Sequence, residues 1–216
     1  MMNLANQQIV KILAEYSVGV DGESALVKSI RAYVDLLTQW NRSISLTTIT
    51  EPEDIVRFHF GESLFAATCV PITNGRLADV GTGAGFPGLP LKMLIPSLDL
   101  TLIESNAKKA AFLGEIVRKL GLDQVHIFRG RMEEFSEEPT LTPSSPFDFI
   151  AGRALGQFDE VLAWSRAHLA SAGKIVLWLG QEDLASISQK PGWDWADPVK
   201  IPGSMRRFII WGVPRD

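Results

Sequence analysis

The chain has very little cysteine and no long apolar run. Its 216 residues include a single cysteine, Cys69, which excludes an internal disulfide framework and a cysteine-based zinc site. No apolar stretch approaches the roughly 18 residues of a membrane-spanning helix. The amino terminus also lacks a basic region followed by an apolar run and a small-residue cleavage site. We therefore expect a cytoplasmic protein without a membrane segment.

Positive charge is not in excess either. The formal net charge is −4, which argues against a general binder of polyanions, although a local basic patch can still recognise RNA. Neither a metal-ligand cluster nor a Ser-His-Asp order stands out, so we predict no metal site and assign no catalytic residue. The length fits one large domain, or one domain with an appendage.

Glycine is concentrated in one stretch, around which the chain is organised. Residues 76–91 read RLADVGTGAGFPGLPL, in which a short apolar strand ends at Val80. Gly81, Gly83 and Gly85 follow at once, and apolar residues then continue at helical spacing. Glycines permit positive φ and let backbone N–H groups approach a ligand, while a helix start adds free donors and partial positive charge. The pattern predicts a ligand-binding strand, loop and helix.

Two ligand classes use such a loop. Gly83, Gly85 and Gly88 match the dinucleotide fingerprint G-x-G-x-x-G, which leaves an NAD(P)-dependent oxidoreductase as an alternative. Asp79 and Gly81 instead begin the pattern acidic-x-Gly-x-Gly-x-Gly of S-adenosylmethionine sites. The register favours the second pattern, because the glycines begin directly after the strand. An aspartate also suits an ammonium and a sulfonium better than a pyrophosphate.

The rest of the chain predicts an α/β fold. We expect helices in residues 1–41, over 50–68, from near Phe86, over 106–120, over 157–170 and after 181. Beyond the strand that ends at Val80, we expect strands over 98–103, 124–128, 147–151 and 173–179, near 199, and over 207–213. Residues 136–146 are expected to form a loop. Alternating strands and helices indicate a parallel sheet covered on both faces. Ligands of such sheets bind outside the carboxyl ends of the strands.

Candidate ligand contacts stand at those strand ends. Glu104 ends the second strand, where a carboxylate can accept hydrogen bonds from both ribose hydroxyls of a nucleoside; the alternative is a solvated glutamate. The segment with Met132 and Glu133 follows the third strand, where an adenine would lie, or is a surface turn. Arg153 follows the fourth strand and can hold a carboxylate or a phosphate, or is merely exposed.

Basic residues gather in two places. Lys108 and Lys109 lie early in the helix after Glu104, and Arg206 and Arg207 lie near the carboxyl terminus. Both pairs are candidate contacts to nucleic-acid phosphates, and a charged solvated face is the alternative.

Two segments carry a resemblance to a known family. DVGTGAGFPGLPL (79–91) and TLIESNAKKAAFL (101–113) resemble the RsmG family, also called GidB, the bacterial 16S ribosomal RNA guanine-N7 methyltransferases. Further matches are Trp40-Asn41, Leu46-Thr47, His59 with Glu62-Ser63, the segment 131–135, Arg153-Ala154 and Arg206. The resemblance covers nearly the whole chain.

The resemblance implies a fold, a cofactor and a substrate. The fold is that of a class I S-adenosylmethionine-dependent methyltransferase, Rossmann-like, with a mostly parallel seven-stranded sheet (73–216) and a small amino-terminal helical extension (1–72). The substrate is 16S ribosomal RNA or the small ribosomal subunit, and we expect a monomer. By analogy, Gly81, Phe86, Met132, Glu133 and Arg153 contact the cofactor. With the loop and strand-end residues, the predicted cofactor site comprises Asp79, Gly81, Gly83, Gly85, Phe86, Glu104, Met132, Glu133 and Arg153.

The chain departs from the family at three places. The usual Arg-His pair is here Phe58-His59, the usual Lys-Gly after the fifth strand is Leu179-Gly180, and the usual Arg-His near the end is Arg206-Arg207. These departures leave a non-catalytic RNA-binding or ribosome assembly factor as an alternative. Guanine N7 has a free lone pair, so the expected reaction needs no general base. A lone histidine such as His59 is more often a packed core residue than a catalytic one.

Overall fold

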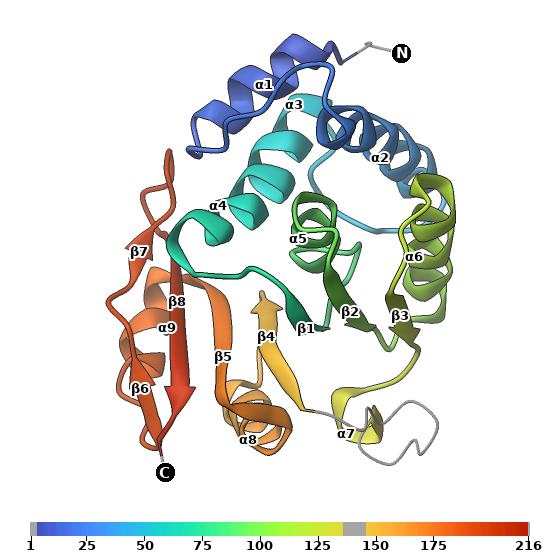
Figure 1. The fold of residues 1–216 in the computed structure, drawn as a ribbon. Helices are drawn as coiled ribbons and strands as arrows, with labels where there is room; N and C mark the ends of the chain where they lie inside the picture. Colours follow the sequence, from blue (N-terminus) through green and yellow to red (C-terminus); the bar gives the residue numbers. More distant parts are fainter. Residues whose placement is uncertain (1–3, 136–145, 216) are drawn as a thin grey trace.

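One mixed sheet forms the centre of the molecule (Figure 1). The computed structural model describes residues 4–135 and 146–215, so the predicted loop over 136–146 lies almost wholly outside the described residues. The strands are β1 (Gly75–Val80), β2 (Leu98–Ile103), β3 (Val125–Phe128), β4 (Phe147–Arg153), β5 (Leu169–Gly180), β6 (Trp193–Trp195), β7 (Val199–Lys200) and β8 (Arg207–Pro214).

The strand order is β3-β2-β1-β4-β5-β8-β6, with β7 paired to β8. The five strands from β3 to β5 are parallel, whereas β8 runs antiparallel to β5, β6 and β7. The predicted α/β class and mostly parallel sheet are confirmed. The sheet has eight strands rather than seven, because the short β6 and β7 both pair with β8.

Helices cover both faces of the sheet. They are α1 (Asn6–Ala14), α2 (Ala25–Asn41), α3 (Pro52–Ile55), the π-helix η1 (Val56–Gly61), α4 (Glu62–Cys69), α5 (Gly88–Leu94), α6 (Ala107–Leu120), α7 (Met132–Phe135), α8 (Phe158–His168) and α9 (Gln181–Ile187). Successive strand residues point to opposite faces. Leu77 accordingly packs in one buried cluster with α1 to α6, and Ala78 packs in a second with α7 to α9. None of the described helices is long and apolar enough to cross a membrane.

Local hydrogen bonds determine where α6 and α5 begin. The side chain of Asn106 accepts from the N–H groups of Lys108 and Lys109 at 2.9 and 3.2 Å, and Gly121 closes α6 in a left-handed conformation. The predicted helix over 106–120 is therefore confirmed. The predicted start of α5 near Phe86 is wrong by two residues, because the helix begins at Gly88, whose N–H donates to the Asp79 carboxylate.

The third predicted helix contains a π-helical turn. Residues 52–69 form α3, η1 and α4 without a break. A π turn inserts an extra residue into the helix and is frequent at functional sites. Here it contains Phe58 and His59 and directly precedes Glu62.

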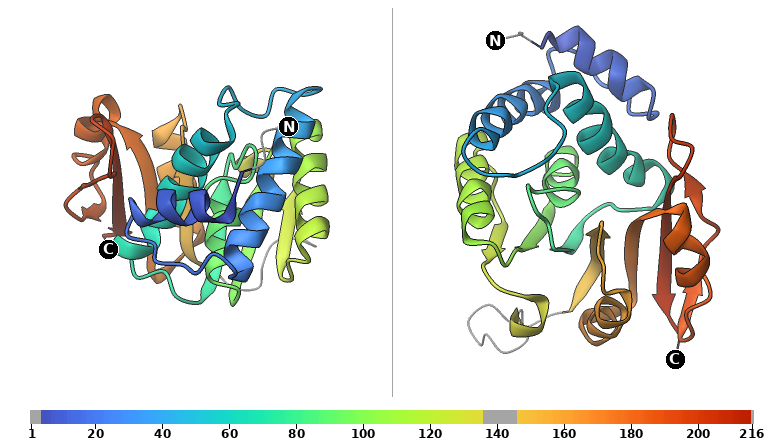
Figure 2. Two further views of the ribbon diagram at one scale, coloured as in Figure 1. Left: turned by 90° about the horizontal axis from the view of Figure 1, so that it is seen from above. Right: turned by 180° about the vertical axis from the view of Figure 1, so that it is seen from behind.

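The amino-terminal helices support the glycine loop. The Tyr33 hydroxyl of α2 donates to the carbonyl of Ala84 at 2.5 Å, and its ring stacks on Phe86 with centroids 5.4 Å apart. Figure 2 shows these helices, in blue to teal, gathered against the sheet and α5. The boundary at residue 72 stays a prediction, but the helices before it share one buried cluster with the sheet after it.

Candidate cofactor and substrate site

The glycine loop turns directly off the carboxyl end of β1. Gly81 and Gly83 have φ values of 64° and 60°, a region that favours glycine. A Cβ added to Gly81 would also lie 3.1 Å from the side chain of Leu155. Sequence and geometry agree that bare backbone is required at this strand end.

Asp79 holds the loop from beneath. It is fully buried, and one carboxylate oxygen accepts from the Thr82 hydroxyl at 2.5 Å and from the Gly88 N–H at 2.8 Å. Burial raises its pKa to about 7 against these hydrogen bonds. Asp79 therefore joins β1 to the start of α5 and does not face the cavity described next.

A cavity of about 220 Å³ opens at the carboxyl ends of the parallel strands. It is lined by Val80, Gly81, Ile103, Glu104, Ser105, Gly130, Arg131, Met132, Glu133, Leu155, Gly156, Gln157 and Val161. Four predicted cofactor residues are among them, namely Gly81, Glu104, Met132 and Glu133. Sequence reasoning missed the contribution of Ser105, Gly130 and residues 155–157, although each lies shortly after the carboxyl end of a strand.

Glu104 connects the cavity to the loop. The residue is 6% exposed, and its two carboxylate oxygens accept from the N–H groups of Gly83 at 2.9 Å and Asn106 at 2.7 Å. Each oxygen keeps acceptor capacity for a second donor. The prediction that Glu104 meets ribose hydroxyls is compatible with this geometry and stays a prediction.

The remaining predicted cofactor residues lie outside the cavity lining. Gly83 and Gly85 shape the loop, and Phe86 is a buried ring between Tyr33 and His59. Arg153 lies at the end of β4, beside Gly81, since Val80 pairs with Gly152 in the sheet. These residues surround the site rather than line its cavity.

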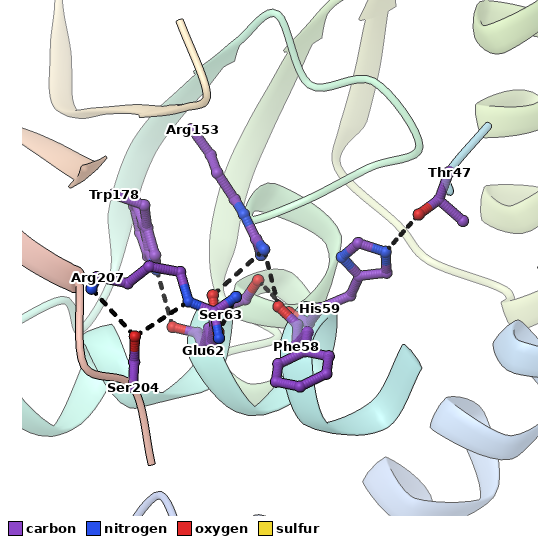
Figure 3. Close-up of polar contacts among 9 residues, drawn as sticks. All are labelled: Thr47, Phe58, His59, Glu62, Ser63, Arg153, Trp178, Ser204 and Arg207. Carbon is purple, nitrogen blue, oxygen red and sulfur yellow. Dashed lines mark hydrogen bonds and ion pairs between the residues drawn. The ribbon is translucent and has the colours of Figure 1, made fainter. Parts of the chain in front are cut away.

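Arg153 belongs to a buried polar network that Figure 3 shows. Its Nη2 donates to the carbonyl of Phe58 at 2.8 Å and pairs with the Glu62 carboxylate at 3.2 Å. Glu62, which is 1% exposed, also pairs with Arg207 at 2.8 Å. Its main-chain carbonyl accepts from the indole N–H of Trp178. One carboxylate thus serves two guanidinium groups, which leaves the network with one excess positive charge.

His59 stands beside this network. Its ring stacks on Phe86 with centroids 4.7 Å apart, and Nε2 lies 2.8 Å from the Thr47 hydroxyl. Burial lowers the pKa of His59 to about 3, and the charges of Arg153 and Arg207 add to this effect. The ring is therefore neutral near pH 7 and is a poor proton acceptor.

The two predicted basic pairs lie far apart. Lys108 and Lys109 stand at the start of α6, whereas Arg206 and Arg207 stand at the start of β8, and every view places α6 and β8 on opposite sides of the molecule (Figures 1 and 2). Arg206 is exposed and pairs with Glu182, while Arg207 pairs inward with Glu62. They do not form one basic patch, and their contact with RNA stays a prediction.

Two departures from the family pattern meet in space. The guanidinium of Arg207 lies over the ring of Phe58, 4.9 Å from its centroid. Leu179, the third departure, is a buried core residue, 4% exposed.

Among the residues that the structure describes, no group of three or more His, Cys, Asp or Glu side chains could hold a metal ion.

Comparison with known proteins assigns the chain to a family. The sequence model described as rRNA small subunit methyltransferase G matches residues 26–193. The chain belongs to this family. The ribosomal RNA small subunit methyltransferase G of Xylella fastidiosa (strain 9a5c) is 35% identical over 89% of this chain and 90% of its own length. That of Desulfitobacterium hafniense (strain Y51) is 34% identical over 78% and 69%.

Solved structures support the fold of this methyltransferase G family member. A ribosomal protein L11 methylase from Lactobacillus delbrueckii subsp. bulgaricus superposes with a TM-score of 0.60 at 13% identity, covering 74% of this chain and 80% of its own. A precorrin-6y C5,15-methyltransferase from Geobacter metallireducens gives 0.56 at 17% identity, covering 80% and 92%. The family match includes the glycine loop, His59 and Arg153, whereas Arg206 and Arg207 lie beyond its last residue.

Proposed function

We propose that this chain transfers a methyl group from S-adenosyl-L-methionine to N7 of a guanine in small-subunit (16S) ribosomal RNA. The observation that carries the proposal is the cavity beside Gly81 at the carboxyl ends of the strands, in a chain of the methyltransferase G family. The substrate would be the RNA or the small ribosomal subunit, which implies a cytoplasmic enzyme. Action as a monomer stays a prediction.

The residues of the cavity fit the cofactor. Gly81 lines the cavity with main chain alone, which suits close approach of the methionine and sulfonium part. The Glu104 carboxylate suits the ribose hydroxyls, and Met132 and Glu133 suit the adenine. Arg153 remains a candidate for a carboxylate contact. In this proposal Asp79, Gly83, Gly85 and Phe86 act through the shape of the loop.

The geometry is less suited to a dinucleotide. The second glycine of that fingerprint, here Gly85, lets the main chain approach the pyrophosphate. A Cβ added to Gly85 would instead meet the Tyr33 hydroxyl and the Leu89 side chain, so this glycine faces the protein interior rather than a ligand. The structure therefore offers no specific observation in favour of the oxidoreductase alternative.

The residues of this chain would act by positioning. Bound S-adenosylmethionine supplies an electrophilic methyl group, and guanine N7 offers its lone pair without loss of a proton. Holding the two in line can contribute roughly 7–11 kcal/mol to the rate. The neutral His59, with its pKa of about 3, is not needed as a base. The guanine must be unstacked to reach the site.

A labelled transfer assay tests the proposal. Small subunits or 16S RNA lacking the modification are incubated with methyl-tritiated S-adenosylmethionine, and the methylated nucleoside is identified after digestion. We expect label in N7-methylguanosine with the wild-type protein and none with a folded Gly81→Val variant. A protein that binds S-adenosylmethionine and unmodified subunits but transfers no label would instead be the non-catalytic assembly factor.

A further inference from the structure

The loop between β7 and β8 exposes a large apolar side chain. Met205 is 83% exposed, whereas every other large apolar side chain in residues 4–135 and 146–215 is at least partly buried. Single apolar side chains are common on protein surfaces, so exposure alone assigns no role to Met205. What distinguishes this residue is the way the loop supports it, its place on the sheet and the charges beside it.

Hydrogen bonds fix the conformation of this loop. The Ser204 N–H donates to the carbonyl of Ile201 at 3.1 Å. The Ser204 hydroxyl oxygen accepts from the N–H groups of Arg206 and Arg207 at 3.3 and 3.0 Å, and from Nε of Arg207 at 3.2 Å (Figure 3). The backbone around Met205 is thus ordered before any partner binds, which lowers the entropy cost of binding through its side chain.

The loop stands at the carboxyl ends of the parallel strands. Arg207, which follows the loop, pairs with Gly180 at the end of β5, and β5 lies beside β4. Figure 1 shows the loop extending beyond β7 and β8, the strands that it joins. The cavity that we assign to the cofactor is lined by residues at or after the ends of β1 to β4, and no described residue of β5 or β8 lines it. The ends of β5 and β8 therefore form a part of this edge that the cofactor leaves to the methyl acceptor.

The surroundings of Met205 suit RNA. The side chains of Arg206 and Glu182 form an ion pair but are 71% and 83% exposed, and such a pair contributes little to stability. The Arg206 guanidinium can therefore exchange Glu182 for an RNA phosphate. Arg207 lies over the half-buried ring of Phe58, 4.9 Å from its centroid. Cations for phosphates beside apolar surface for base faces are typical of sites for single-stranded nucleic acid.

We propose that Met205 is a wedge that stacks on the bases next to the acceptor guanine and holds that guanine out of the RNA stack. Proteins that kink or unstack nucleic acids often insert an apolar side chain, methionine included, between neighbouring bases. The unbranched, polarisable side chain of methionine can adapt to the flat face of any base. Met205 is then a positioning residue, since it contacts bases beside the one that is methylated. This inference rests on the proposed function.

The test measures unstacking and methyl transfer separately. Small-subunit RNA is prepared by ligation with 2-aminopurine beside the target guanine, because the fluorescence of 2-aminopurine rises when it loses a stacked neighbour. A second RNA carries an abasic residue on the other side of the guanine, which leaves the guanine poorly stacked from the start. Single-turnover methyl transfer is measured on both RNAs at saturating RNA and S-adenosylmethionine, and calorimetry measures the affinity for S-adenosylmethionine.

Two variants make the test specific. Met205→Ala removes the wedge, and Met205→Leu keeps an apolar side chain of similar size. On the intact RNA, Met205→Ala should be slower than the wild type by at least about tenfold, which is part of the cost of unstacking a base, and should lose most of the fluorescence rise. Met205→Leu should stay within about threefold of the wild type. On the abasic RNA, the deficit of Met205→Ala should shrink to within about threefold. Affinity for S-adenosylmethionine should be the same in all three proteins.

Other outcomes overturn the inference. An unchanged rate of Met205→Ala on the intact RNA would show that the loop does not act on the stacked bases. A deficit that persists on the abasic RNA, or a full fluorescence rise in the slow variant, would assign Met205 to docking and not to unstacking. In these cases a wild type that methylates the intact RNA leaves the proposed function standing. A wild type that methylates neither RNA would refute the proposed function, and the inference with it.

Discussion

The guanidinium of Arg207 lies 4.9 Å from the centroid of the Phe58 ring while it pairs with the buried Glu62 at 2.8 Å. This interaction joins the start of the last strand to the π-helical turn of the amino-terminal region. A cation over an aromatic face gains most where water is partly excluded. The position that lacks the family's usual arginine is thus covered by an arginine from the other end of the chain.

Removing the charge of Glu62 should destabilise the protein. Glu62→Gln leaves Arg153 and Arg207 without their shared counter-charge, and loss of one partner of a buried pair costs about 3 kcal/mol or more. Glu182→Gln is the matched control, because it breaks a pair whose side chains are 83% and 71% exposed and should cost less than about 1 kcal/mol. Urea unfolding measures both, and similar small losses would mean that the network adds little.

A side chain at Gly81 should abolish cofactor binding. Gly81→Val puts a branched side chain at a φ of 64° and against Leu155, where we place the cofactor. Gly114→Ala is the control, since a Cβ there meets nothing within 4 Å. Calorimetric titration with S-adenosylmethionine should show no binding for the first variant and wild-type affinity for the second. Unchanged affinity in folded Gly81→Val would reject the assignment.

Glu104 should contribute to affinity through two effects. Glu104→Ala removes the proposed acceptor for the ribose and also frees the N–H groups of Gly83 and Asn106. We expect the binding free energy for S-adenosylmethionine to weaken by about 1–3 kcal/mol, the scale for charged or unmet hydrogen bonds. A dissociation constant within a factor of about two of the wild-type value would contradict the ribose assignment.

Charge reversal at Lys108 and Lys109 should weaken RNA binding and flatten its salt dependence. For each RNA phosphate that a lysine no longer neutralises, the slope of log K against log salt should fall by about one. Reversal of Lys11 and Lys119 is the control, because it changes the net charge equally at two other places. Affinity for S-adenosylmethionine should stay unchanged in both. An identical salt slope for the two double variants would mean that Lys108 and Lys109 form only a solvated face.

Asp79 should make stability depend on pH. Its folded pKa of about 7 lies above the ordinary value of 3.8, so between these values the folded state binds more protons than the unfolded state. Its contribution is complete below about pH 3.8 and is lost as the pH rises toward 7. The stability of the wild type relative to Asp79→Asn should therefore fall by roughly 1.4 kcal/mol per pH unit in this window. Urea unfolding from pH 4.5 to 8.5 tests this, and a constant difference would contradict it.

The sequence predicted the parts of the fold that rest on local patterns. The strand and glycine loop at Gly81, the helix predicted over 106–120 and the parallel character of the sheet follow from spacing, capping and alternation. The strand over 193–195 was missed, because three residues are too few to show a period. The π turn before Glu62 was missed as well, since its apolar positions continue a helical pattern.

The candidate site was predicted less completely, for a physical reason. Glu104, which directly follows β2, and Met132, in the segment after β3, could be placed because parallel strands end at one edge. The ion pairs of Glu62 with Arg153 and Arg207 join residues far apart in the chain, so no local sequence pattern predicts them. The structural role of Asp79, whose buried carboxylate accepts hydrogen bonds from Thr82 and Gly88, was not predicted either, because its charge suggested a contact to the ligand.

Tyr33 makes the amino-terminal helices part of the glycine loop's structure, although they lie outside the predicted methyltransferase domain. Its hydroxyl bonds to Ala84 and its ring stacks on Phe86, so the loop that we assign to the cofactor is built with a residue from the opposite side of the predicted boundary at residue 72. The helical segment is therefore not an attachment that can be exchanged to redirect a self-sufficient catalytic unit toward another RNA. A transplant of residues 73–216 alone would carry the glycine loop without the ring and hydroxyl against which it is folded.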